Sequence, residues 1–287
     1  MKPMISRRGF LGSTAAAGAL SILPRRVLGV RSDATPGGEL DFPLVDFHSH
    51  IEGNFTVEEA VRLAAKRGVK LGIVEHGGFG EVIGNDSDLK RHIQRLSALP
   101  VYKGIQAEGH NWMSCFSKEV VCQLDYVLAD ALTFPEKDGR RVQLWTPEAK
   151  IDDKQDFMER YVDFNVQVIS KEPIDIFANP TFLPEALANE YDTLWTKERM
   201  RKVIDAALKY EVAIEINSRF NIPSWAFVKM AKDMGVKFSF GSNNRNADVG
   251  KLDYSAKIAK ECGLTRQDMF MPQPPDKKPI LRRTWRA

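Results

Sequence analysis

Leu44-Val45-Asp46-Phe47-His48-Ser49-His50 reads as a short strand, over 44–47, that ends among ionisable side chains. Six further apolar runs of similar length follow, at 69–74, 101–107, 126–129, 174–178, 212–216 and 236–240. Helical patterns separate these runs, at about 56–67, 87–99, 152–170, 196–210, 223–234 and 253–262. Thr56 with Glu59 forms a capping box before the first helix, and Ser87 is expected to cap the second. Strands alternating with helices predict parallel pairing through right-handed crossovers.

The distribution of polar residues chooses between an open sheet and a barrel. Polar side chains stand at or just after the ends of nearly all the predicted strands, at His48, His50, Glu75, His76, Glu108, His110, Asp130, Asn179, Glu215, Asn217, Asn243 and Arg245. An open sheet gathers its ligands at one switch point, whereas a barrel collects them from all strand ends at one mouth. The sequence therefore predicts an α/β barrel. No glycine-rich phosphate fingerprint follows a strand, so a dinucleotide cofactor is not expected.

The first residues predict an export signal. Ser6-Arg7-Arg8-Gly9-Phe10-Leu11-Gly12 precedes a weakly apolar run from Ser13 to Leu23, which is the layout of a twin-arginine leader. The alternative is an amphipathic first helix that happens to carry two arginines. We expect the leader at 1–32, a linker at 33–42, the barrel at 43–265 and a C-terminal tail at 266–287. The twin-arginine translocation machinery would be a partner, and the protein would work in the periplasm or outside the cell.

Charge and cysteine content narrow the classes of partner. The whole chain has a formal charge of +3, but residues 1–32 contain six basic residues and no acid, so the remainder carries −3. A mildly acidic domain offers no electrostatic reason to bind nucleic acid, and a small molecule is the expected substrate. The three cysteines lack the spacing of a metal site; we interpret them as small buried hydrophobes, with one disulfide as the alternative.

The end of the first strand is the strongest candidate for a metal site. Side chains alternate along a strand, so Asp46, His48 and His50 are expected to face the same way. Two imidazoles spaced in this way can chelate one divalent ion, and a neighbouring carboxylate can add charge or orient a ring. The alternative is a pair of hydrogen-bonded histidines without a metal.

These motifs resemble the PHP (polymerase and histidinol phosphatase) family, from about Val45 to Gly250. The matching segments are 46–50, Ile73-Val74-Glu75-His76, Gly104-Ile105-Gln106-Ala107-Glu108, 125–130, 175–180, Glu215-Ile216-Asn217 and Gly241-Ser242-Asn243-Asn244-Arg245. The resemblance implies a distorted (β/α)7 barrel and a metal-dependent phosphoesterase. The chain departs from the family pattern where Leu132, Asn179, Asn243 and Arg245 replace histidine or aspartate ligands.

These departures imply one ion rather than several. The remaining ligand set is His48, His50 and Glu108, completed by His76 or Asn243, and it suits zinc, manganese or iron. His76 or His110 would carry the proton, and Arg245 with Asn179, Asn217 and Asn243 would bind the substrate. Asp46, Glu75, Asp130 and Glu215 would support the ligands through hydrogen bonds. His92, in the middle of a helix, is expected at the surface.

The resulting hypothesis is an exported metal-dependent hydrolase. Its substrate would be a small phosphate ester or a carbohydrate-like molecule, and a metal-activated water would attack it. Two alternatives remain at this point. One is a decayed site, in which Arg245 pairs with Glu108 or Glu215 and the barrel only binds an extracytoplasmic ligand. The other is a metal-dependent sugar lyase.

Overall fold

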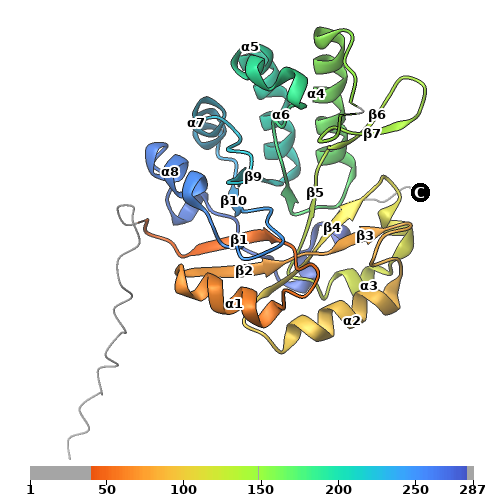
Figure 1. Cartoon of the computed structure of the whole chain (residues 1–287), viewed down its shortest axis with the longest axis vertical. Helices are drawn as coiled ribbons and strands as arrows, with labels where there is room; N and C mark the ends of the chain where they lie inside the picture. Colours follow the sequence, from red (N-terminus) through yellow and green to blue (C-terminus); the bar gives the residue numbers. More distant parts are fainter. Residues whose placement is uncertain (1–39, 148, 283–287) are drawn as a thin grey trace, which may run out of the picture. The chain divides into compact units, whose positions relative to one another are not determined.

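The computed structural model describes residues 40–147 and 149–282, and within them parallel strands close into a barrel (Figure 1). The barrel strands are β1 (Leu44–Ser49), β2 (Val69–Ile73), β4 (Tyr102–Glu108), β5 (Tyr126–Ala129), β8 (Ile176–Phe177), β9 (Ala213–Asn217) and β10 (Phe238–Gly241). Each pairs in parallel with its neighbour, and the pairings β2–β4 and β1–β10 close the ring. A short strand β3 (His76–Gly78) continues the path of β2 beside β4. The predicted α/β barrel is confirmed.

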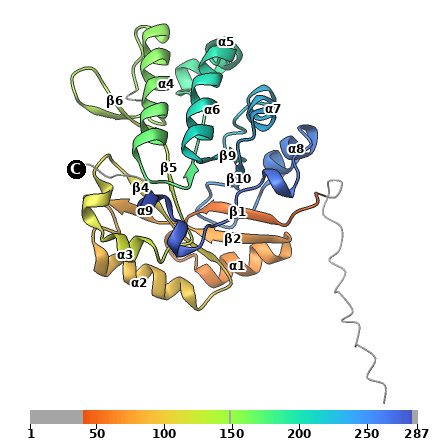
Figure 2. The same ribbon diagram turned by 180° about the vertical axis from the view of Figure 1, so that it is seen from behind.

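Helices lie outside the strands, as the two opposite views show (Figures 1 and 2). The longer ones are α1 (Val57–Lys66), α2 (Asp86–Ser97), α4 (Lys154–Lys171), α6 (Lys197–Tyr210), α7 (Trp225–Met234) and α8 (Asp253–Glu261). The shorter ones are α3 (Lys118–Val121), α5 (Tyr191–Leu194), α9 (Pro279–Arg282) and the 3₁₀ turns η1 (Trp112–Cys115), η2 (Glu185–Glu190), η3 (Arg266–Asp268) and η4 (Pro275–Lys277). A hairpin, β6 (Thr133–Pro135) with β7 (Arg141–Gln143), precedes α4.

Local signals at the helix ends are mostly where the sequence predicted them. Thr56 and Glu59 form both hydrogen bonds of a capping box at α1. The cap of α2 is Asn85 and not Ser87, because the Asn85 side chain accepts hydrogen bonds from the backbone N–H groups of Ser87 and Asp88.

A single aromatic ring fills the middle of the barrel. Tyr126 points inward and donates its hydroxyl hydrogen to the carbonyl of Phe47, at 2.7 Å. A Cβ atom on Gly104 would lie 2.4 Å from this ring, and one on Gly72 would lie 2.5 Å from its oxygen. Glycine is required at both places because the ring occupies the space. Phe47, Leu128 and Phe270 pack with it in one apolar cluster, so side chains fill this part of the barrel interior.

The predicted leader lies outside the described residues, as do most of the predicted linker and the last residues of the tail, so these boundaries stay predictions. Among the helices of residues 40–147 and 149–282, none combines the length and the apolar character needed to cross a membrane. Within these described residues Cys115, Cys122 and Cys262 form no disulfide bond. Of the three, Cys262 is buried, whereas Cys115 and Cys122 are partly exposed.

Candidate metal centre

A β-bulge at the end of β1 determines which side chains enter the barrel. Asp46 pairs with Leu71, but Ser49 pairs with Ile73, so β1 carries one more residue than β2 across this interval. The extra residue shifts the alternation of side chains. Phe47 packs in the apolar cluster around Tyr126. The rings of His48 and His50, which come next along the chain, lie with their centroids 5.3 Å apart.

Asp46 therefore does not share a face with the two histidines, and the prediction that it would is wrong. Its carboxylate accepts hydrogen bonds from the backbone N–H groups of His48, Ser242 and Gly250 and from the hydroxyls of Ser49 and Ser242. Gly250 packs against Ala64 of α1, which places this carboxylate on the helix side of β1. Asp46 thus fastens β1 to the loop that follows β10.

His48 forms a buried ion pair with Glu215. Its Nδ1 lies 2.7 Å from Glu215 Oε1, and its Nε2 lies 3.1 Å from Gln106 Oε1. Both oxygens are acceptors, because the amide nitrogen of Gln106 donates to Glu108 and Asp130. Both ring nitrogens of His48 must therefore carry hydrogen. Burial acts to lower the pKa of His48, but the Glu215 carboxylate outweighs it and raises that pKa.

Both ring nitrogens of His48 are thus engaged in hydrogen bonds, and His48 presents no free lone pair in this arrangement. Its predicted role as a metal ligand stays a prediction. The buried cation and carboxylate compensate each other, and the same pairing lowers the pKa of Glu215 despite its burial.

The ring nitrogens of His50, unlike those of His48, are not hydrogen-bonded within the described part of the chain. His50 is 1 % exposed, and neither Nδ1 nor Nε2 makes a hydrogen bond of good geometry among the described residues, although the Gln106 side chain lies near enough to act to raise its pKa. Its ring stacks on that of His76, with centroids 4.8 Å apart and planes 19° apart. Burial and the neighbouring His48 hold the pKa of His50 well below its ordinary range. His50 is therefore a neutral imidazole with a buried lone pair.

His76 has one nitrogen fixed and one directed outward. Its Nδ1 lies 2.9 Å from Glu108 Oε1, and Arg245 Nη2 lies 3.3 Å from its Nε2. A guanidinium can only donate, so Nε2 presents a lone pair and the ring carries its proton on Nδ1. Burial acts to lower the pKa of His76, but the hydrogen bond to the Glu108 carboxylate outweighs it and raises that pKa.

Glu75 completes a cluster with these two histidines. One ligand atom from each of His50, Glu75 and His76 lies within 4.8 Å of the other two, an arrangement that can hold a metal ion. Glu75 lies between β2 and β3, and its carbonyl accepts a hydrogen bond from Gln106 N. The structure thus places Glu75 among the potential ligands, where a supporting role was predicted, and places Glu108 behind His76 as the group that orients it.

Three asparagines form a network beside this cluster. Asn179 Oδ1 accepts from Asn217 Nδ2 at 2.8 Å and from Asn243 Nδ2 at 3.2 Å, while Asn179 Nδ2 donates to Asp130 Oδ2 at 2.7 Å. Asn179 and Asn243 have φ values of 47° and 46°, in the left-handed region that asparagine tolerates. Asn217 Oδ1 also accepts from the backbone of the following turn. Burial and the nearby Glu108 raise the pKa of Asp130 to about 6.

Two predicted residues lie elsewhere or pair differently. His110 contacts Phe164 of α4, and its Nδ1 lies 3.7 Å from Glu172 Oε1. Gly109, with φ of 77°, turns the chain after Glu108, so His110 does not continue the side-chain alternation of β4. Arg245 forms an ion pair with Glu52, at 2.8 Å, and not with Glu108 or Glu215.

Gln106 and Glu52 were not predicted as site residues. Gln106 links His48, Glu108 and Asp130, and a signal for it existed, since strand alternation places position 106 on the same face as Glu108. Glu52 follows β1 in a loop, and nothing in the sequence indicates that it meets Arg245.

No protein-family model and no characterised protein sequence matches this chain. Several solved structures are distantly similar, among them the following three. A chain of archaeal ribonuclease P with mature tRNA is 14 % identical, with a TM-score of 0.38, over 76 % of this chain and 87 % of that one. An HpcH/HpaI aldolase from Desulfitobacterium hafniense DCB-2 is 12 % identical, with a TM-score of 0.35, over 79 % of this chain and 95 % of that one. A citrate lyase from Burkholderia xenovorans LB400 is 11 % identical, with a TM-score of 0.33, over 79 % of this chain and 80 % of that one. Likeness at this level supports no assignment of function.

Proposed function

We propose that this barrel is a metal-dependent hydrolase of the PHP type, with one divalent ion held by His50, Glu75 and His76. The observation that supports it best is the state of His50. A buried imidazole with two unpartnered nitrogens costs free energy that a folded chain normally avoids. A metal ion accepts such a lone pair, and zinc, manganese and iron all bind imidazole with carboxylate.

The residues around the cluster suit hydrolysis. A divalent ion, when bound, supplies a Lewis acid that polarises the scissile group and acidifies water. Glu108 holds the proton on Nδ1 of His76 and so keeps Nε2 free as a donor atom. His48, protonated beside Glu215, can give its Nε2 proton to a leaving group. Asp130, with a pKa of about 6, can exchange a proton near neutral pH.

We propose a single ion because the other polar groups are already engaged. Asn179 Oδ1 accepts two hydrogen bonds from its amide neighbours, Leu132 is apolar, and His48 has no lone pair. The substrate would be a small phosphate ester or a carbohydrate-like molecule, whose polar end would meet Arg245 and Asn243.

Metal analysis of three proteins tests the ligand set. Wild type and His48→Gln are expected to bind about one zinc or manganese ion per chain, and His50→Ala to lose most of it, because, of these two histidines, His50 has the unpartnered nitrogens. Loss of the metal in both variants would restore the set predicted from sequence, which contains both histidines, and retention in His50→Ala would overturn the proposed centre. Metal-free wild type that still binds sugars or phosphate esters would favour a pure binding barrel.

A substrate screen tests the reaction type. The metal-loaded protein is expected to release product from phosphate esters or glycosides, and water labelled with ¹⁸O should enter that product. Formation of an unsaturated sugar without incorporation of label would instead identify a lyase.

A further inference from the structure

Arg245 occupies the nitrogen of His76 that a metal ion needs. Nδ1 of His76 is engaged by Glu108, so Nε2 is the ring atom left for coordination. Arg245 Nη2 lies 3.3 Å from it and can act there only as a donor. The guanidinium and a metal ion cannot use one lone pair at the same time. Their positive charges would also repel each other.

The same guanidinium has a second anchor at the rim. Arg245 Nε lies 2.8 Å from Glu52 Oε1, and the two side chains are 32 % and 58 % exposed. Both residues lie in loops, Glu52 after β1 and Arg245 after β10. Arg245 can therefore leave His76 while it stays paired with Glu52, without opening the buried layer below.

We propose that Arg245 is a displaceable internal cation that competes with the metal for His76. In the metal-free protein it pairs with the Glu52 carboxylate and covers the lone pair of His76. When an ion binds, Arg245 moves away toward Glu52 and remains at the mouth as a binding group for an anion. This inference rests on the proposed function, since it concerns the same metal centre. It predicts that Arg245 weakens metal binding, the reverse of what a supporting residue would do.

A cobalt titration of the full chain measures this competition. Co²⁺ bound by imidazole and carboxylate absorbs visible light, and competition with a chelator gives its Kd. Arg245→Gln is expected to bind Co²⁺ about tenfold more tightly than wild type, since a hydrogen bond from a charged donor is lost from the competing state. Arg245→Lys keeps the charge but reaches less far, and its Kd should lie between the two.

Arg219→Gln is the matched control. Arg219 is exposed, whereas Arg245 is half-buried, and it donates to the carbonyl of Asn243, so this variant removes the same charge without touching His76. Its Kd for Co²⁺ should stay within about threefold of wild type, as screened surface charges have small effects. If both variants bound Co²⁺ more tightly by the same factor, the effect of Arg245 would be explained by its charge alone, and the proposed competition for His76 would be overturned.

The outcomes also separate this inference from the proposed function. Equal or weaker binding by Arg245→Gln, with one ion bound to wild type, overturns the competition and leaves the metal centre intact. Tight binding by Arg245→Gln alone supports the competition. Absence of Co²⁺ binding by every variant, with melting temperatures unchanged, overturns both.

Discussion

His92 lies on the buried side of α2, 6 % exposed, and its Nε2–H donates to the carbonyl of Gly104 at 2.9 Å. The prediction that His92 lies at the surface was wrong, although the apolar pattern of the helix indicates a buried position. Leu89, Ile93 and Leu96 are the other buried residues of α2, and His92 falls within their stripe. Burial outweighs this hydrogen bond and lowers the pKa of His92 to about 4.

A pH titration of stability tests the state of His92. The unfolded chain binds a proton near pH 6.5, whereas the folded chain does so only near pH 4. Between these values the unfolded state holds more protons, so the free energy of unfolding falls as the pH is lowered from 6.5 toward 4. The loss from this residue should reach about 3 kcal/mol. Urea unfolding at pH 7 and pH 4.5 should show a smaller difference for His92→Gln, which can donate to Gly104 but cannot titrate.

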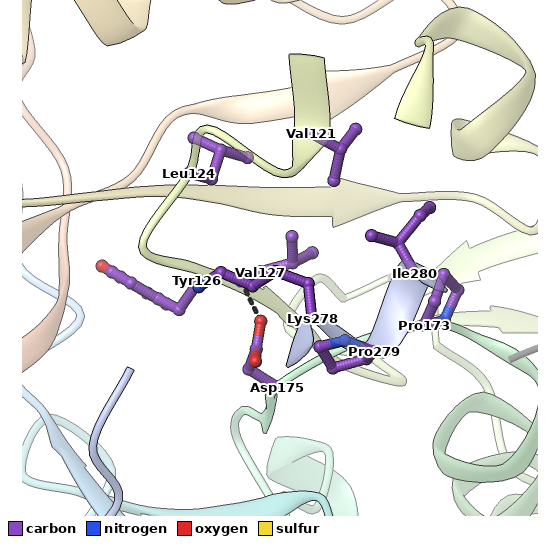
Figure 3. Close-up of a pocket in the computed structure, with 9 residues that line it drawn as sticks. All are labelled: Val121, Leu124, Tyr126, Val127, Pro173, Asp175, Lys278, Pro279 and Ile280. Atoms are coloured by element: carbon purple, nitrogen blue, oxygen red, sulfur yellow. Dashed lines mark hydrogen bonds between the residues drawn. The ribbon is translucent and has the colours of Figure 1, made fainter. Parts of the chain in front are cut away.

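The C-terminal segment of η4 and α9 packs against β5 as a structural element of the barrel. Lys278, Pro279 and Ile280 line a small cavity together with Val121, Leu124, Tyr126, Val127, Pro173 and Asp175 (Figure 3). Lys278 is 4 % exposed and donates to the carbonyl of Asp125, and burial lowers its pKa. The part of the predicted tail that the structure describes is therefore anchored.

Truncation of Ile280 tests how much this element contributes. Ile280 is 2 % exposed, so Ile280→Ala should lower the free energy of unfolding by about 2–4 kcal/mol, through lost burial and an enlarged cavity. The neighbouring Leu281 is 48 % exposed, and Leu281→Ala should change it by less than about 0.5 kcal/mol. Urea unfolding of both variants makes the comparison; similar small losses would mean that the segment is not anchored in solution.

The proposed metal centre would couple metal binding to the folding of the whole barrel, because His50 follows β1 while Glu75 and His76 lie at the β2–β3 junction. An ion that binds only the folded protein stabilises it by mass action. Under this proposal the unpartnered nitrogens of His50 would make the metal-free barrel the less stable form.

Thermal unfolding with and without metal checks this coupling. At a free ion concentration of about 100 Kd the gain is about 2.7 kcal/mol, which for a domain of this size raises Tm by about 5–10 °C. His50→Ala should show little of this rise under the same conditions. A rise of equal size in the variant would place the ion somewhere else.

The barrel itself follows from local patterns in the sequence. Apolar runs, helix stripes and caps depend on residues within a few positions of one another, and the seven predicted strands lie within a few residues of the observed ones. The strand-end positions of His50, Glu75, His76 and Glu108 also follow from these patterns, because parallel strands bring their carboxyl ends to one mouth.

Which of these side chains meet was decided only by tertiary structure. The bulge between Asp46 and Ser49 exists through the register with β2, which no local pattern encodes. The pairing of His48 with Glu215 joins residues 167 positions apart, and it leaves His50, rather than both histidines, with a free lone pair. Local sequence determines backbone conformation through short-range sterics and hydrogen bonds, whereas the partner of a buried charge depends on which strands the closed barrel makes neighbours.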